Sequence, residues 1–131
     1  MAKRILIVED DENLGKILGG RLRAAGFDVR WVPDAISAVG HAVEFKPRLI
    51  ILDLMLPGGD GLGVLRHLNA SVYTNLIPVM VLTGREEEDW KRQALSLGVV
   101  AYVLKPYDAK YVVEEAKKIL NCPGQFSKEL L

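Results

Sequence analysis

The stretch LIILDLMLPGGDG, residues 49–61, combines an apolar run, a single carboxylate and a turn signal. The run from Leu49 to Leu52 is typical of a strand that is buried on both faces of a parallel sheet. Asp53 follows it directly, and an ionised carboxylate beside apolar surroundings is costly unless another group pairs with it. Strands often end in clusters of Asp, Gly and Pro, so Asp53 alone indicates only where this strand stops. A functional role for it requires charge partners elsewhere in the chain.

Short apolar runs alternate with longer helical patterns along the whole chain. The predicted strands are 5–8, 28–32, 49–53, 77–82 and 99–104, and the predicted helices are about 11–25, 33–46, 61–69, 86–97 and 108–120. Strands that alternate with helices predict parallel βαβ units with right-handed crossovers, and therefore an α/β doubly wound, five-stranded parallel sheet. A closed barrel needs eight such units, for which this chain is too short.

Length and composition restrict the class of protein further. A chain of 131 residues is most simply one domain, and its 17 basic residues balance its 17 acidic residues. We therefore expect no direct nucleic-acid binding by this domain and no attraction to membranes. The single cysteine, Cys122, and the absence of a signal-peptide pattern fit a cytoplasmic protein. We expect one domain over residues 1–121, with residues 122–131 as a C-terminal tail or the stub of a linker.

Polar side chains follow four of the five predicted strands, at the edge where functional groups gather in doubly wound sheets. They are Glu9, Asp10 and Asp11 after the first strand, Asp53 after the third, Thr83 at the end of the fourth and Lys105 after the fifth. Each group alone has an ordinary explanation as a helix cap, a turn or a loop. Their occurrence at the same edge of successive strands favours a shared site.

The chemistry that fits this set is phosphoryl transfer to a carboxylate. Clustered acids repel one another, and a few hard oxygen ligands with room for waters and phosphate oxygens suit Mg²⁺. Asp53 can act as a nucleophile and form an acyl phosphate. Lys105 can offset charge on the transferred group, and the Thr83 hydroxyl can bond a phosphate oxygen.

Four segments resemble the receiver domains of two-component response regulators, in the same order and at similar spacing. They are ILIVEDD (5–11), LIILDLMLPGGDG (49–61), VMVLTG (79–84) and YVLKPYD (102–108). The resemblance covers about residues 3–120 and implies a flavodoxin-like (βα)5 fold with strand order 2-1-3-4-5. It implies that Asp53 takes a phosphoryl group from a sensor histidine kinase or histidine phosphotransfer protein. It also implies a Mg²⁺ site formed by Glu9, Asp10, Asp53 and the backbone carbonyl of Met55.

The same resemblance implies that the chain is a signalling switch and not an enzyme. Thr83 matches the switch hydroxyl, Tyr102 the switch aromatic and Lys105 the phosphate-binding lysine, and the bond before Pro106 is expected to be cis. The resemblance also implies a downstream output protein or domain. A homodimer through the surface of the fourth helix, fifth strand and fifth helix is a further arrangement that it suggests.

Several residues receive no role at the site. Asp11 matches a variable position and is expected to cap a helix. Trp31 and Trp90 are expected to pack or to lie at the surface, and His41 and His67 lie in predicted helices away from the site. The chain also departs from common receiver patterns, which concerns its pairing surfaces and not phosphorylation. These departures are at Arg48, Gly59 and Val99.

Residues at specific positions argue against other functions. A phosphatase of the haloacid dehalogenase type needs a second acid where this chain has Met55. A P-loop fails because Val64 and Leu65 replace its Lys and Ser or Thr, and an EF-hand fails because Leu14 occupies an oxygen-ligand position. A flavodoxin-like cofactor module gives no reason for Lys105 and the acids. A single-domain regulator and the receiver fragment of a longer DNA-binding transcriptional regulator both remain open.

Overall fold

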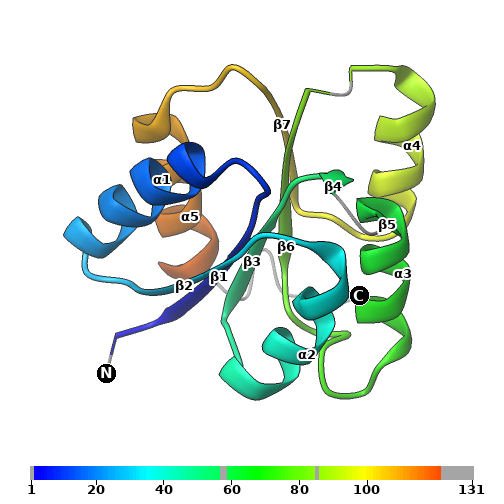
Figure 1. The fold of residues 1–131 in the computed structure, drawn as a ribbon, viewed down its shortest axis with the longest axis horizontal. Helices are drawn as coiled ribbons and strands as arrows, with labels where there is room; N and C mark the ends of the chain where they lie inside the picture. Colours follow the sequence, from blue (N-terminus) through cyan, green and yellow to red (C-terminus); the bar gives the residue numbers. More distant parts are fainter. Residues whose placement is uncertain (1, 57–58, 85, 122–131) are drawn as a thin grey trace.

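The fold is a five-stranded parallel sheet with helices on both faces (Figure 1). The computed structural model describes residues 2–56, 59–84 and 86–121. Its sheet contains β1 (Arg4–Val8), β2 (Asp28–Val32), β3 (Leu49–Leu52), β6 (Val79–Thr83) and β7 (Ala101–Leu104), in the order β2-β1-β3-β6-β7. The helices are α1 (Glu12–Ala24), α2 (Ala35–Phe45), α3 (Gly61–Ala70), α4 (Glu88–Ser96) and α5 (Ala109–Asn121). Counting the sheet strands along the chain gives the predicted order 2-1-3-4-5, which is confirmed.

The sheet separates two apolar layers. Alternate residues of each central strand enter opposite layers: Leu6 and Val8 pack on one side, and Ile5 and Ile7 pack on the other. The first layer is covered by α2, α3 and α4, and the second by α1 and α5, as Figure 1 shows. Because both faces are buried, these strands have continuous apolar sequences and show no polar alternation.

The ends of the elements follow local chemistry. Asp11 caps α1 as expected, because its side chain accepts hydrogen bonds from the backbone N–H groups of Asn13 and Leu14. Gly26 follows α1 with φ of 99°, a left-handed conformation that glycine adopts without strain. Among the described residues, no helix is long and apolar enough to cross a bilayer.

Most predicted element bounds differ from the structure by one or two residues, and three differences affect the sheet and the connection after it. A short antiparallel hairpin, β4 (Met55–Leu56) with β5 (Gly59–Asp60), lies between β3 and α3 and was not predicted. The fourth sheet strand starts at Val79 and not at residue 77, because Pro78 has no N–H to donate, although its carbonyl accepts from Ile50 N. The last sheet strand starts at Ala101 and not at residue 99. The predicted tail, residues 122–131, lies outside the described residues.

Candidate functional site

Backbone hydrogen bonds extend beyond the strand ends and fix the residues that follow them. Asp53 N donates to the carbonyl of Val8 at 2.9 Å, and Lys105 N donates to the carbonyl of Thr83 at 2.8 Å. The chain positions that carry the predicted site residues are therefore tied to neighbouring strands. Side chains that are far apart in sequence are held at one edge of the sheet.

The ammonium group of Lys105 bridges two buried carboxylates. Its Nζ lies 2.8 Å from Oδ2 of Asp53 and 2.6 Å from Oε1 of Glu9. The second oxygen of each acid accepts a backbone N–H, from Met55 to Asp53 Oδ1 at 2.9 Å and from Asp11 to Glu9 Oε2 at 3.1 Å. Each carboxylate is thus held by one cation and one main-chain donor, so its orientation is defined. These contacts supply the charge partners that Asp53 requires.

Burial of the charged groups changes the pKa values at the site. Glu9 and Asp53 are each only 4% exposed. Burial, reinforced by the nearby charge of Asp53, raises the pKa of Glu9 to about 7, against the opposing hydrogen bonds from Lys105 and Asp11. Burial alone would lower the pKa of Lys105, but its hydrogen bonds and charge contacts with Asp53 and Glu9 outweigh burial and raise it. The carboxylates therefore keep Lys105 charged.

Glu9, Asp10 and Asp53 form a cluster suited to a divalent cation. One carboxylate oxygen from each lies within 4.8 Å of the other two, and Asp10 is exposed whereas the others are buried. When ionised, three acids against the single positive charge of Lys105 leave an excess of two negative charges. Hard oxygen donors with one side open to solvent match the preference of Mg²⁺ for few protein ligands and several waters. The residues present therefore fit the predicted metal, while the part of the Met55 carbonyl stays a prediction.

Thr83 and Tyr102 lie on the two strands nearest to Lys105. Thr83 ends β6 and is fully buried, and it pairs in register with Leu104, the residue before Lys105. Tyr102 is partly buried in β7 and packs against the apolar layer that α2, α3 and α4 cover. The peptide bond between Lys105 and Pro106 is cis. The two predicted switch residues and the lysine thus belong to one pair of adjacent strands.

Gly61 explains part of the glycine-rich turn after Asp53. Its N–H donates to the carbonyl of Leu54 at 2.8 Å, which brings the start of α3 against the loop that carries the acid. A Cβ at Gly61 would lie 2.4 Å from Leu54 Cα and 2.8 Å from the carbonyl oxygen of Asp53. Only glycine permits this approach without displacing the loop.

One contact at the site was not predicted from the sequence. The indole Nε1 of Trp31 donates to the backbone carbonyl of Glu9 at 2.7 Å. An isolated tryptophan in a strand carries no motif, so packing was the reasonable expectation. The only available signal was general: the indole N–H of a buried tryptophan usually donates a hydrogen bond to a partner.

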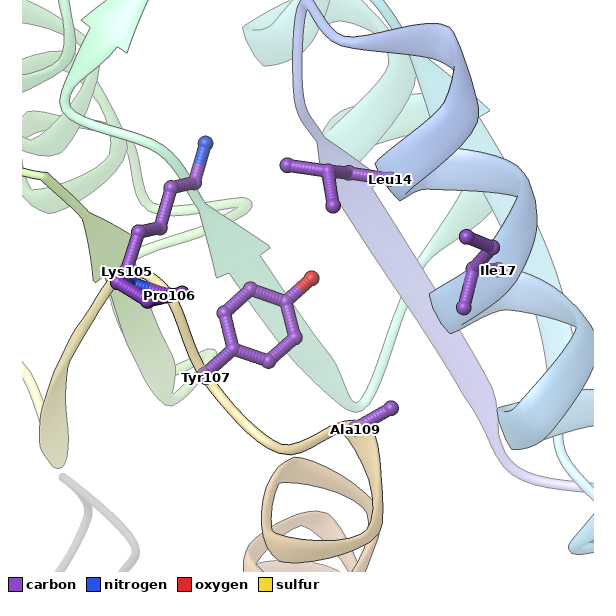
Figure 2. Close-up of a pocket in the computed structure, with 6 residues that line it drawn as sticks. All are labelled: Leu14, Ile17, Lys105, Pro106, Tyr107 and Ala109. Atoms are coloured by element: carbon purple, nitrogen blue, oxygen red, sulfur yellow. The ribbon is translucent and has the colours of Figure 1, made fainter.

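An apolar hollow opens beside Lys105 (Figure 2). It has a volume of about 450 Å³ and lies between α1 and the loop that joins β7 to α5. Tyr107 stands in this loop with its ring facing α1, and Ile17 on α1 is 57% exposed. The lining residues are Leu14, Ile17, Lys105, Pro106, Tyr107 and Ala109.

Comparison with known proteins gives a consistent result. Residues 5–117 match the family described as "Response regulator receiver domain". The chain is 38% identical over 121 residues to the phosphate regulon transcriptional regulatory protein PhoB of Escherichia coli, covering 92% of this chain and 53% of that protein. It is 41% identical over 118 residues to the transcriptional activator protein IrlR of Burkholderia pseudomallei, covering 90% and 50%. The chain thus spans about half the length of these curated relatives.

A solved structure shares the fold over nearly its whole length. The response regulator from Desulfuromonas acetoxidans superimposes with a TM-score of 0.80 and is 30% identical in sequence. The match covers 91% of this chain and 97% of that one. The architecture described above therefore matches that structure over most of both chains.

Proposed function

Because this chain belongs to the response regulator receiver domain family, we propose that Asp53 is its phosphoacceptor. One observation carries the proposal: the Asp53 carboxylate lies at the carboxyl edge of the sheet, with one oxygen on Lys105 Nζ and the other on Met55 N. A carboxylate oxygen has two lone pairs, so both oxygens keep acceptor capacity beyond these bonds. A held and oriented carboxylate is what an in-line attack on phosphorus requires.

The reaction is a simple group transfer. An oxygen of Asp53 attacks the phosphorus of the donor, the bond from phosphorus to the donor atom breaks, and the donor leaves with the electron pair. The product is an acyl phosphate on Asp53. Lys105 Nζ, now shared between Asp53 and Glu9, is close enough to follow the added negative charge and bind a phosphoryl oxygen.

We propose that Glu9, Asp10, Asp53 and the Met55 carbonyl hold Mg²⁺. Support comes from the 4.8 Å cluster of acid oxygens and their excess negative charge. When bound, Mg²⁺ would offset the repulsion between these acids and an incoming phosphoryl group. The chain itself would contribute these hard oxygen donors, held at fixed positions at the carboxyl edge of the sheet.

We propose that the phosphorylation state is relayed through Thr83 and Tyr102 to the surface of α4, β7 and α5. Phosphorylation adds negative charge and strong acceptors next to the end of β6. Thr83 moves toward these acceptors, and Tyr102 turns inward behind it. Two arrangements that differ by a few kcal/mol are sufficient for such a switch.

The apolar hollow beside Lys105 supports a docking role for the phosphodonor protein. A donor histidine must reach Asp53 from the solvent side, and the hollow is an apolar depression next to the lysine that contacts Asp53. Ile17, exposed on α1, gives a partner an apolar contact there. We propose that a sensor histidine kinase or a histidine phosphotransfer protein binds here.

We also propose a cellular role for the domain. The chain acts in the cytoplasm as a non-enzymatic switch that controls a downstream output protein or domain. A domain boundary near residue 121, with 122–131 as a linker stub, suits a receiver of a longer DNA-binding regulator, because the matched relatives are about twice as long. A homodimer through the surface of α4, β7 and α5 is the arrangement that we propose for signalling.

The direct test is phosphorylation by acetyl phosphate. Intact-mass spectrometry should show one phosphoryl adduct on the wild type with Mg²⁺ and none after chelation. Asp53→Asn should show none, whereas Asp108→Asn, which changes an exposed aspartate outside the cluster, should behave like the wild type. An adduct that persists in Asp53→Asn would contradict the proposal.

A further inference from the structure

Trp31 is connected to the acidic turn by a specific hydrogen bond. It lies on β2, in register with Ile7 of β1, and its side chain is half-buried. Its Nε1 donates to the backbone carbonyl of Glu9 at 2.7 Å, across 22 residues of sequence. Packing alone would not require this contact, because an indole can bury its ring with the N–H directed to water.

The helix opposite Trp31 is shaped to accept the ring. Gly15 lies in the first turns of α1, and a Cβ added to it would lie 2.6 Å from Nε1 and 2.7 Å from Cδ1 of Trp31. Glycine inside a helix costs up to about 1 kcal/mol relative to alanine. The chain accepts this cost at a position where any side chain would displace the indole.

The hydrogen bond completes the fixation of the Glu9 backbone. Glu9 N donates to the carbonyl of Val32 at 3.1 Å, which extends the ladder between β1 and β2. Trp31 holds the carbonyl on the other side of the same residue. Asp10 follows immediately, and Asp11 caps α1. The turn from 9 to 11 is thus held by a strand, an indole and a helix cap.

We infer that Trp31 is a positioning residue for metal binding, which holds the turn of Glu9 and Asp10 so that their carboxylates face Asp53. The inference rests on the proposed Mg²⁺ site and extends it to a residue that touches neither the metal nor the phosphoryl group. Substitution of a group that orients metal ligands through a hydrogen bond commonly lowers the affinity of the site for its metal.

Trp31→Phe tests the role of the N–H, because phenylalanine keeps a ring against Gly15 and lacks the donor. Loss of one neutral hydrogen bond should weaken Mg²⁺ binding about fivefold, measured by isothermal titration calorimetry. Trp90→Phe is the matched control, since Trp90 lies on α4 in the opposite layer, and it should bind Mg²⁺ as the wild type does.

The control variant also provides a spectroscopic reading. With Trp90 replaced, Trp31 is the only tryptophan in the chain. Its emission should change with added Mg²⁺ and saturate at the dissociation constant found by calorimetry. A ring that only fills space would not be expected to follow metal binding in this way.

Gly15→Ala removes the same hydrogen bond from the other side. Alanine improves the intrinsic helix propensity of α1, so weaker Mg²⁺ binding in this variant cannot be blamed on a weaker helix. The effects of Gly15→Ala and Trp31→Phe should be less than additive in the double variant, because both remove one contact.

The outcomes separate the two proposals. Wild-type protein that binds no Mg²⁺ would overturn the metal site and this inference with it. The inference alone would be overturned if the wild type binds Mg²⁺, Trp31→Phe and Gly15→Ala bind it equally tightly, and the emission of Trp31 does not change with added Mg²⁺. Weaker binding in both variants, with Trp90→Phe unchanged, would support it.

Discussion

Lys105 Nζ lies 2.8 Å from Oδ2 of Asp53, although 52 positions separate the two residues in sequence. The same ammonium group contacts Glu9 at 2.6 Å. One cation therefore compensates two carboxylates that are almost completely buried. This arrangement holds the site together before phosphorylation, and Lys105 is also the group best placed to respond to it.

Removing the Lys105 charge should destabilise the protein and impair phosphorylation. Lys105→Met leaves two buried carboxylates without their cation, and a hydrogen bond to a charged group is worth about 2 kcal/mol. We expect a loss of this size in the free energy of unfolding, measured by urea denaturation at neutral pH with chelator present. Added Mg²⁺ should recover part of it. Lys110→Met, at an exposed position of α5, should change neither stability nor phosphorylation.

The raised pKa of Glu9 predicts a pH-dependent stability. Its pKa is about 7 in the folded protein and near 4.5 when unfolded, so the folded state binds more protons between these values. The free energy of unfolding of the metal-free protein should therefore fall as pH rises through this window. Glu9→Gln should show a smaller fall in denaturation measured from about pH 5 to about pH 8.

The same titration affects the metal. Because bound Mg²⁺ requires ionised ligands, its affinity should rise with pH as Glu9 loses its proton. Calorimetry in buffers of different ionisation heat should detect this proton release near neutral pH. An affinity that does not change with pH while Glu9→Gln also binds normally would remove Glu9 from the site.

The hollow next to Lys105 predicts a difference between protein and small-molecule donors. Ile17→Glu places a charge in the apolar docking surface without touching the acids. Phosphoryl transfer from a phosphorylated histidine phosphotransfer protein should slow at least about tenfold, which corresponds to about 1.4 kcal/mol, while the rate with acetyl phosphate stays unchanged. Ile36→Glu, at an 80% exposed position on α2, is the matched control. Equal slowing with both donors would point to damage at the site instead of lost docking.

The proposed relay predicts coupled changes at two residues. With Mg²⁺ and phosphodonor, NMR signals of the Thr83 methyl group and the Tyr102 ring should both shift. Thr83→Ala should still accept the phosphoryl group, but its Tyr102 signal should remain near the unphosphorylated position. Asp53→Asn should show no donor-dependent shift at either residue. A Tyr102 shift of wild-type size in Thr83→Ala would mean that the hydroxyl is not part of the relay.

The main strands and helices could be predicted because their signals are local. Continuous apolar runs marked the buried strands, and polar residues at the carboxyl ends of β1, β3, β6 and β7 indicated one shared edge once the sheet was known to be parallel. Strand starts were less certain, as at Val79, where the apolar pattern extends back through Pro78 but the hydrogen-bond ladder does not. The hairpin of β4 and β5 escaped prediction because two-residue strands have no periodicity.

Contacts that depend on three-dimensional packing could not be predicted. Nothing in the sequence near Trp31 connects it to the carbonyl of Glu9, since the contact exists only when β2 lies beside β1. A glycine at position 15 is unfavourable inside a helix, and its structural reason is the indole of Trp31 beside it. The bridging of Asp53 and Glu9 by one lysine likewise required the geometry of the folded sheet.

The central claim is that Asp53 carries the phosphoryl group, and chemical trapping tests it most directly. Borohydride reduces an acyl phosphate to an alcohol, which converts the modified aspartate to homoserine. After treatment with acetyl phosphate and Mg²⁺, peptide sequencing by mass spectrometry should find homoserine at position 53 and unmodified Glu9 and Asp10. Reduction at Asp10 or Glu9 with Asp53 unchanged, or no reduced residue in protein that carries the phosphoryl adduct, would contradict the account.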